Sequence, residues 1–140
     1  MLTSTDPDYP CFHLAPARGR LNDPNGLVVA DGVYHAFFQY GPGFPQDKLV
    51  HWGHASSEDL VHWRHHRPAI YPDSWYDRCG AYSGGAIVHD GDVWFHYTGN
   101  VKTDAGERES YQCLVTSSDL VTFVKDADNP LIAGPPPCTI

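Results

Sequence analysis

The sequence has little positive charge. Its 140 residues include nine Lys and Arg against seventeen Asp and Glu, which gives a formal net charge of −8 at pH 7. The few basic residues do not cluster along the chain. Such a surface repels a phosphate backbone, so we expect no nucleic-acid partner.

Long apolar runs are missing as well. No stretch reaches the roughly 18 consecutive apolar residues that suggest a membrane-spanning helix, so we expect no membrane partner. Residues 1–7 lack the basic and apolar regions of a secretory signal peptide. We therefore expect a cytoplasmic protein.

Cysteine is scarce and scattered. The four residues form no C-x-x-C pair, which argues against a structural zinc site; they are Cys11, Cys79, Cys113 and Cys138. In a chain without an export signal we expect them to be reduced. Gly-x-Gly-x-x-Gly and P-loop patterns are also absent.

Aromatic residues, glycine and proline are plentiful: four Trp, eight Tyr, six Phe, thirteen Gly and twelve Pro. Aromatic side chains suit pleated surfaces, whereas Gly and Pro interrupt helices. The composition therefore favours an all-β fold, and the length suits one domain.

Three sequence blocks recur in the same order, 59 to 62 residues further along the chain. The matched pairs are 26–34 with 85–93, 57–63 with 117–123, and 67–70 with 129–132. Each copy contains an Asp-Gly pair between two apolar runs, which is a strong hairpin signal because the turn requires positive φ. The repeat therefore predicts two similar units of antiparallel structure.

Each copy is predicted to form four strands. They are 27–30, 33–40, 51–56 and 62–67 in the first copy, and 86–89, 93–98, 112–116 and 122–125 in the second. Four antiparallel strands are the unit of a β-propeller blade. We expect blade 1 at about 22–70 and blade 2 at about 82–132.

Two blades cannot close a ring, since propellers usually have about four to eight. We therefore expect the natural sequence to continue beyond Ile140. The alternative is a small two-sheet domain complete in itself, which would leave sheet edges and faces exposed.

The most distinctive segment is Leu21-Asn22-Asp23-Pro24-Asn25-Gly26. Its simplest interpretation is a β-turn, with Pro at the second position and Gly at the fourth. The second copy has Ser83-Gly84 at the matching point, so the fold itself does not require Asp-Pro-Asn-Gly there. This difference makes Asp23 a candidate functional residue.

Five blocks together resemble glycoside hydrolase family 32, the group of invertases, levanases, inulinases and sucrose-6-phosphate hydrolases. In family order they are Asn22–Gly26 with Phe12-His13 ahead of it, Phe37–Tyr40, His51–Ala55, Ser57 with Asp59–Trp63, and Tyr82–Gly84. The resemblance implies a five-bladed β-propeller, of which this chain is about the first two blades. The rest of the propeller and a C-terminal β-sandwich would then be absent from the chain.

The resemblance also implies hydrolysis of terminal β-D-fructofuranosides, such as sucrose, sucrose 6-phosphate or fructans, with retention of configuration. Retention requires two carboxyl groups about 5–5.5 Å apart, a nucleophile and an acid/base. By resemblance Asp23 is the nucleophile. No metal and no organic cofactor are implied.

The family's sugar-binding positions carry over to five residues of this chain. Asn22, Gln39 and Ser83 would hydrogen-bond fructose hydroxyls. Tyr82 stands beside Ser83 where the family usually has Phe. Trp52 would line or support the pocket.

Several family elements do not occur in the chain. The Glu-Cys motif that holds the acid/base and the Arg-Asp-Pro motif that holds a stabilising Asp are both missing. We therefore expect the 140-residue chain alone to be inactive. The family's Trp-Gly-Asn is replaced by Asp47-Lys48-Leu49, which leaves the preferred fructoside open.

Other interpretations of these residues remain. A carbohydrate-binding propeller would use Asp23 only as a turn residue or hydrogen-bond acceptor, and a fructosyltransferase would use another sugar in place of water.

His51-x-x-His54 suggests a metal site, but residues three apart on a strand point to opposite faces. Ala81–Gly85 resembles the nucleophile elbow of serine hydrolases, yet a strand and not a helix is expected after it. The oligomeric state is not indicated.

Overall fold

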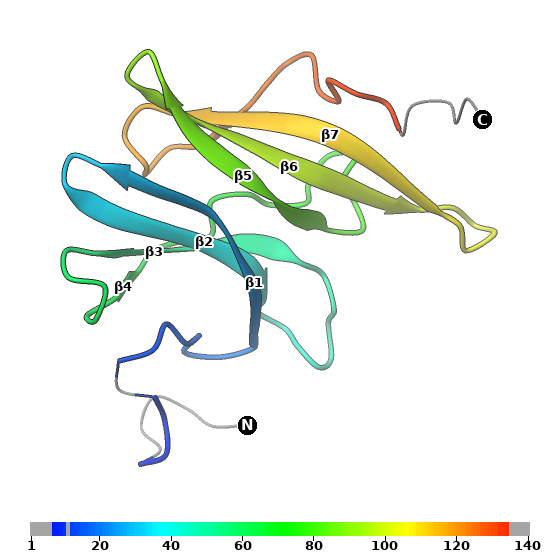
Figure 1. Cartoon of the computed structure of the whole chain (residues 1–140). Helices are drawn as coiled ribbons and strands as arrows, with labels where there is room; N and C mark the ends of the chain where they lie inside the picture. The colour runs from blue at the N-terminus through cyan, green and yellow to red at the C-terminus, as the bar shows by residue number, and fades with distance from the viewer. Residues whose placement is uncertain (1–6, 11, 135–140) are drawn as a thin grey trace, which may run out of the picture.

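The computed structural model describes residues 7–10 and 12–134, and it is all-β throughout that part of the chain (Figure 1). The strands form two separate four-stranded antiparallel sheets, so the predicted fold class and the four strands per repeat are confirmed. Among the described residues there is no helix long and apolar enough to span a membrane. Cys79 and Cys113 are free thiols, whereas Cys11 and Cys138 lie outside the described residues.

Each sheet follows the chain from strand to neighbouring strand, as a propeller blade does. The first sheet contains, in order, β1 (Arg20–Ala30), β2 (Val33–Gly41), β3 (His51–Ser57) and β4 (Arg64–His65). The second contains β5 (Ala81–His89), β6 (Asp92–Lys102), β7 (Arg108–Ser117) and β8 (Val124–Lys125). Both Asp-Gly hairpins have the predicted backbone, with φ of 50° at Asp31 and 51° at Asp90.

The first strand of each sheet begins earlier than predicted, because β-bulges interrupt it, two in β1 and one in β5. In β1 the register with β2 shifts between Asn22 and Pro24 and again between Asn25 and Val28. The β-turn interpretation of Asp-Pro-Asn-Gly is therefore wrong, since the segment lies inside a strand. Pro24 is tolerated because β1 is the edge strand of its sheet and needs no ladder bond on its free side.

The two sheets pack face to face through aromatic side chains, with β1 and β5 side by side (Figure 1). The rings of Phe37 and Phe95 meet edge to face at 4.7 Å, and Trp52 meets Tyr97 at 6.4 Å. Gly26 is required at its position because φ is 57° and a Cβ atom would lie 2.8 Å from the Trp52 ring. The bulged strand thus closes tightly over the core.

A stack of rings that includes three histidines continues this core. His54 is 1 % exposed and stacks on Phe37 and His66, each with ring centroids 4.4 Å away. Its Nε2 atom lies 2.9 Å from Nδ1 of His35. Burial, followed by the charges of His66 and His35, lowers the pKa of His54 to about 3.

The other histidine of the predicted pair, His51, does not join this stack. Its ring centroid lies 5.4 Å from that of Tyr71. The described residues contain no cluster of side chains suited to a metal ion.

A buried ion pair fixes the connection between the two sheets. Asp77, in the segment between β4 and β5, is fully buried. Its carboxylate accepts hydrogen bonds from Tyr97 Oη at 2.7 Å, from Lys125 Nζ at 2.5 Å and from the backbone N–H of Ser74 at 2.8 Å. Burial by itself would lower the pKa of Lys125, but the hydrogen bonds that its ammonium group donates to Asp73 and Asp77 outweigh burial, so the pKa of Lys125 is raised. The linker that leads into β5 is therefore held firmly on the second sheet.

Candidate active site

Equivalent bulges in the two sheets place Asp23 and Ser83 at the same structural position. Asp23 has no partner in the β1–β2 register, and Ser83 has none in the β5–β6 register. Asp23 adopts a φ of 41°, which is unusual for a residue with a side chain. The Ser83 hydroxyl donates a hydrogen bond to Asp23 Oδ2 at 3.3 Å, so the two bulges bring their side chains together.

Four of the six predicted site residues form one chain of hydrogen bonds. Asn22 and Gln39 face each other across β1 and β2, and the Asn22 amide donates to Gln39 Oε1 at 3.3 Å. The Gln39 amide in turn donates to Ser83 Oγ at 2.7 Å, and Ser83 donates to Asp23. Asn22 and Asp23 are neighbours, whereas Gln39 and Ser83 are distant from them in the sequence, and both sheets contribute to the convergence.

The other two predicted residues lie behind this chain. Trp52 is fully buried, and its Nε1 donates to the backbone carbonyl of Tyr82 at 3.0 Å. Its ring therefore presents no free face to a ligand, and its contact with Tyr82 supports the strand that contains Ser83. The Tyr82 hydroxyl accepts a hydrogen bond from Arg108 Nη1 at 2.9 Å.

Two residues of the site were not predicted as such. The Asn25 amide donates to the backbone carbonyl of Asp23 at 2.8 Å and so holds the bulge in place. Asn25 belongs to the distinctive motif, and the pairing of an Asn with a backbone group two residues away could have been considered from sequence. Arg108 could not be identified from the sequence, because it lies outside every block of the repeat. The register of β6 and β7 is what brings its side chain near Tyr82.

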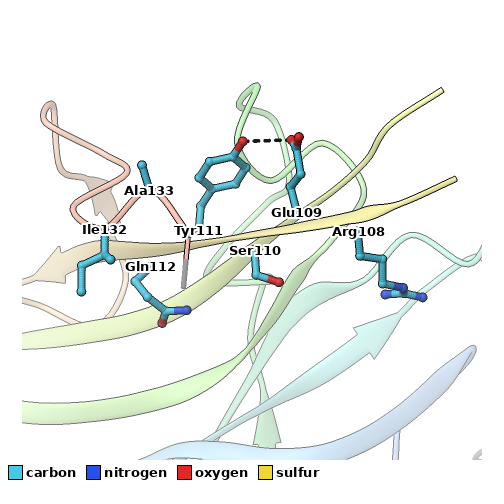
Figure 2. A pocket seen from close by; sticks show the side chains of 8 residues that line it. Arg108, Glu109, Ser110, Tyr111, Gln112, Ile132 and Ala133 are labelled. Carbon is cyan, nitrogen blue, oxygen red and sulfur yellow. Dashed lines mark hydrogen bonds between the residues drawn. The ribbon is translucent and has the colours of Figure 1, made fainter. Parts of the chain in front are cut away.

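A separate cavity of about 600 Å³ lies along one edge of β7 (Figure 2). It is lined by Arg108, Glu109, Ser110, Tyr111, Gln112, Ile132, Ala133 and Gly134. None of the six predicted residues is among these lining residues, although the Arg108 side chain reaches from the cavity to Tyr82. Within the described residues, the candidate site is therefore the convergence of Asp23 with its amide and hydroxyl neighbours.

The chemistry available at this convergence is a carboxylate flanked by two amides and a hydroxyl. Amides and hydroxyls both donate and accept hydrogen bonds, which suits them to sugar hydroxyl groups. The hydrogen-bond chain contains no second carboxyl group among the described residues. A two-carboxylate glycosidase mechanism cannot be completed by these residues alone.

Comparison with known proteins relates this arrangement to a family of glycosidases. The family model described as Glycosyl hydrolases family 32 N-terminal domain matches residues 13–139. Sucrose-6-phosphate hydrolase of Klebsiella pneumoniae is 48 % identical over 120 residues, which are 86 % of this chain and 26 % of that protein. The chain thus spans about a quarter of the length of that curated relative.

Solved structures of enzymes from the same family also match this chain. Sucrose-6-phosphate hydrolase of Lactobacillus gasseri matches with a TM-score of 0.87 and 39 % identity, over 96 % of this chain and 27 % of that one. A mutant β-fructofuranosidase of Bombyx mori, in complex with sucrose, matches with a TM-score of 0.81 and 36 % identity, over 92 % and 27 %. The N-terminal domains of these neighbours are five-bladed propellers, and the two sheets here correspond to about two blades. The chain therefore belongs to glycoside hydrolase family 32.

Proposed function

We propose that the complete protein hydrolyses terminal β-D-fructofuranosides with retention of configuration, and that Asp23 is its nucleophile. The observation that carries the proposal is the hydrogen-bond chain from Asn22 through Gln39 and Ser83 to Asp23, built by both sheets. The fold does not require three polar side chains linked by hydrogen bonds to an exposed carboxylate, whereas a reaction at a sugar does require such groups.

In this mechanism Asp23 attacks the anomeric carbon of fructose and forms a covalent intermediate, which water then hydrolyses. Asn22, Gln39 and Ser83 bind fructose hydroxyls and fix the ring for in-line attack. Trp52 and Tyr82 support the strand that presents Ser83. The reaction requires no metal and no organic cofactor.

The second carboxyl group must come from sequence that this chain does not contain. We propose that residues 1–140 are the N-terminal part of the propeller domain, with blade 1 at about 22–70 and blade 2 at about 82–132. Further blades and a C-terminal β-sandwich would complete the protein. The chain of 140 residues is then expected to have no hydrolytic activity, because one carboxyl group cannot both attack and protonate the leaving oxygen.

The substrate is proposed to be a fructose-containing sugar. The relatives support this class, since two are sucrose-6-phosphate hydrolases and the Bombyx mori enzyme was solved with sucrose. A fructosyltransferase would use the same nucleophile with a sugar as acceptor. A binding-only propeller would leave Asp23 without a chemical role.

The test is Asp23→Asn in the complete enzyme, with Asp31→Asn as the matched control. Asp31 is an exposed aspartate in the turn between β1 and β2, and Asn tolerates its positive φ. We expect Asp23→Asn to lower kcat on sucrose by at least about 1,000-fold, because the amide is nearly isosteric but a poor nucleophile. The control should keep its activity.

The stereochemistry gives a second readout. NMR of the first-formed fructose anomer should show retained β configuration, and addition of a sugar acceptor separates hydrolysis from transfer. Unchanged turnover of Asp23→Asn would remove Asp23 from the mechanism. A complete protein that binds fructosides without cleaving them would favour the binding role.

A further inference from the structure

Tyr82 occupies in the second sheet the position that Asn22 occupies in the first. Each directly precedes a bulge residue, Ser83 in β5 and Asp23 in β1, and each has a partner in the strand register where the bulge residue has none. Asn22 belongs to the hydrogen-bond chain of the candidate site. Tyr82 is half-buried and carries a hydroxyl group where glycoside hydrolase family 32 usually has Phe. The fold therefore does not require this hydroxyl group beside the site.

The Tyr82 ring is held between the backbone and a cation. Gly80 makes room for it, because a Cβ atom at Gly80 would lie 2.7 Å from Cε1 of the ring. On Arg108, the guanidinium group lies 5.8 Å from the ring centroid, within the range of a cation–π interaction. The backbone carbonyl of Tyr82 accepts a hydrogen bond from Trp52 Nε1 at 3.0 Å. Both the ring and the backbone of Tyr82 are therefore fixed.

Arg108 also fixes the hydroxyl group of Tyr82. Its Nη1 atom donates hydrogen bonds to Tyr82 Oη at 2.9 Å and to Asn100 Oδ1 at 3.3 Å. Asn100 is 1 % exposed, and its own amide donates to the backbone carbonyl of Cys79 at 3.4 Å. It is a rigid anchor for the arginine. An exposed side chain of β7 is thus tied across β6 to the first residues of β5.

Acidic residues near Arg108 do not pair with its guanidinium group. Asp104 and Glu107 belong to the same β6–β7 hairpin, yet Arg108 forms no ion pair within the described part of the chain. Glu109 projects from the other side of β7 (Figure 2), where its carboxylate accepts a hydrogen bond from Tyr111 Oη at 2.9 Å. The hairpin is mixed in charge, and Arg108 acts on uncharged neighbours.

The Tyr82 hydroxyl group retains a proton to donate. A phenol has one O–H proton and two lone pairs, and the bond from Arg108 occupies a lone pair. The N–H of the arginine therefore keeps the O–H proton directed away from itself. Among the described residues, no atom accepts that proton. An oriented donor thus lies one residue before Ser83, whose hydroxyl contacts Asp23.

This donor lies outside the group that is proposed to bind fructose. Ser83 is joined to Gln39 of the first sheet and to Asp23. The Tyr82 hydroxyl group is joined instead to Arg108 within the second sheet. The part of a substrate that meets it is therefore the sugar that leaves, and not the fructose.

We propose that the Tyr82 hydroxyl group donates a hydrogen bond to a hydroxyl group of the leaving sugar, and that Arg108 is the positioning residue that sets its orientation. This inference rests on the proposed function. A phenol that accepts a hydrogen bond from a charged group is polarised, which strengthens the bond that it donates. Tyr82 thus favours substrates whose leaving group is a sugar over fructosides with a small leaving group.

The first test compares kcat/KM for sucrose with kcat/KM for methyl β-D-fructofuranoside in the complete enzyme. The methanol that leaves the second substrate carries no further hydroxyl group, so sucrose alone can use the proposed bond. Tyr82→Phe keeps the ring and should lower the ratio of the two values about 3- to 10-fold, mainly through a higher KM for sucrose. Equal losses on both substrates, or no loss on either, would overturn the inference.

The matched control is Tyr34→Phe, which removes the hydroxyl group of an exposed tyrosine of β2. It should keep the ratio of the wild type. A displaced Ser83 would instead lower kcat on both substrates, so the split between kcat and KM separates a lost contact from a distorted strand.

A double-mutant cycle tests the role of Arg108. Arg108→Met keeps an unbranched stem, removes the donor and should lower the same ratio about threefold, and Arg108→Lys should recover part of it. In Tyr82→Phe the hydroxyl group is already gone, so adding Arg108→Met should cause no further fall. Losses that multiply in the double variant would show that Arg108 acts independently of the hydroxyl group, and would overturn its positioning role.

Binding without cleavage separates this inference from the proposed function. Calorimetric titration of the Asp23→Asn enzyme compares sucrose with methyl β-D-fructofuranoside. Adding Tyr82→Phe should raise the Kd for sucrose about 3- to 10-fold more than that for the methyl fructoside. Equal changes, or no binding of sucrose, would overturn the contact with the leaving sugar. A complete protein that cleaves neither substrate would refute the fructosidase function, whereas the titration would still decide on Tyr82.

Discussion

Acid is expected to weaken the packing between the two sheets through His54. This ring is 1 % exposed, stacks on Phe37 and His66, and lies against His35. The pKa values of His35 and His66 are lowered as well, first by burial and then by neighbouring positive charge, from His66 and from Arg64 respectively. All three groups therefore resist protonation in the folded chain.

The sign and size of the effect follow from proton binding. The pKa of His54 is about 3 in the folded chain, against the ordinary histidine value of 6.5, so the unfolded chain binds one more proton between these values. The contribution of His54 to the free energy of unfolding is therefore fully present above pH 6.5, and it is lost as the pH falls from 6.5 towards 3. At about 1.4 kcal/mol for each pH unit, His54 alone costs about 2 kcal/mol at about pH 5.

The assay is urea unfolding of the 140-residue chain from about pH 8 to about pH 5, followed by tryptophan fluorescence. Trp52 lies in the same core and reports its loss. His54→Phe keeps an aromatic ring in the stack and cannot titrate, so its free energy of unfolding should fall by about 2 kcal/mol less than that of the wild type. His96→Phe, at an exposed position of β6, is the control and should match the wild type. If His54→Phe kept the wild-type dependence on pH, His54 would not be the origin of the acid sensitivity.

Two further predictions concern the site and the linker. In the complete enzyme, Ser83→Ala should lower kcat/KM on sucrose by about 10- to 100-fold, because it removes a donor to the Asp23 carboxylate and the acceptor of Gln39; an unchanged value would exclude Ser83 from the site. Lys125→Met should lower the free energy of unfolding by about 3–5 kcal/mol in urea titrations, because it leaves the buried Asp77 carboxylate without its cation. Adding Asp77→Asn should restore part of that loss, and a double variant no better than Lys125→Met would contradict the electrostatic explanation.

The repeated architecture could be predicted from sequence because its signals are local. Asp-Gly hairpins and a period of about 60 residues locate two sheets without any knowledge of how they pack. The bulges could not be predicted, because each one interrupts the alternation by which a strand is identified. For this reason the start of β1 resembled a turn, although Arg20 to Ala30 is one strand.

The candidate site was predicted as a set of residues, without its connections. The chain from Asn22 to Asp23 through Gln39 and Ser83 depends on the position of β5 beside β1, which no local pattern encodes. The hydrogen bond from Arg108 to Tyr82 depends on how β5, β6 and β7 align within the second sheet. Such contacts follow from the three-dimensional arrangement of the strands and not from local sequence patterns.

The matching bulges suggest how such a site can diversify after duplication of a blade. Register shifts at corresponding places in β1 and β5 deliver a carboxylate from one blade and a hydroxyl from the other to the same point. The residue at the bulge has no ladder partner, so its replacement leaves the strand pairing intact. A duplicated scaffold can therefore acquire different chemical groups at one centre through single substitutions, without any change of topology.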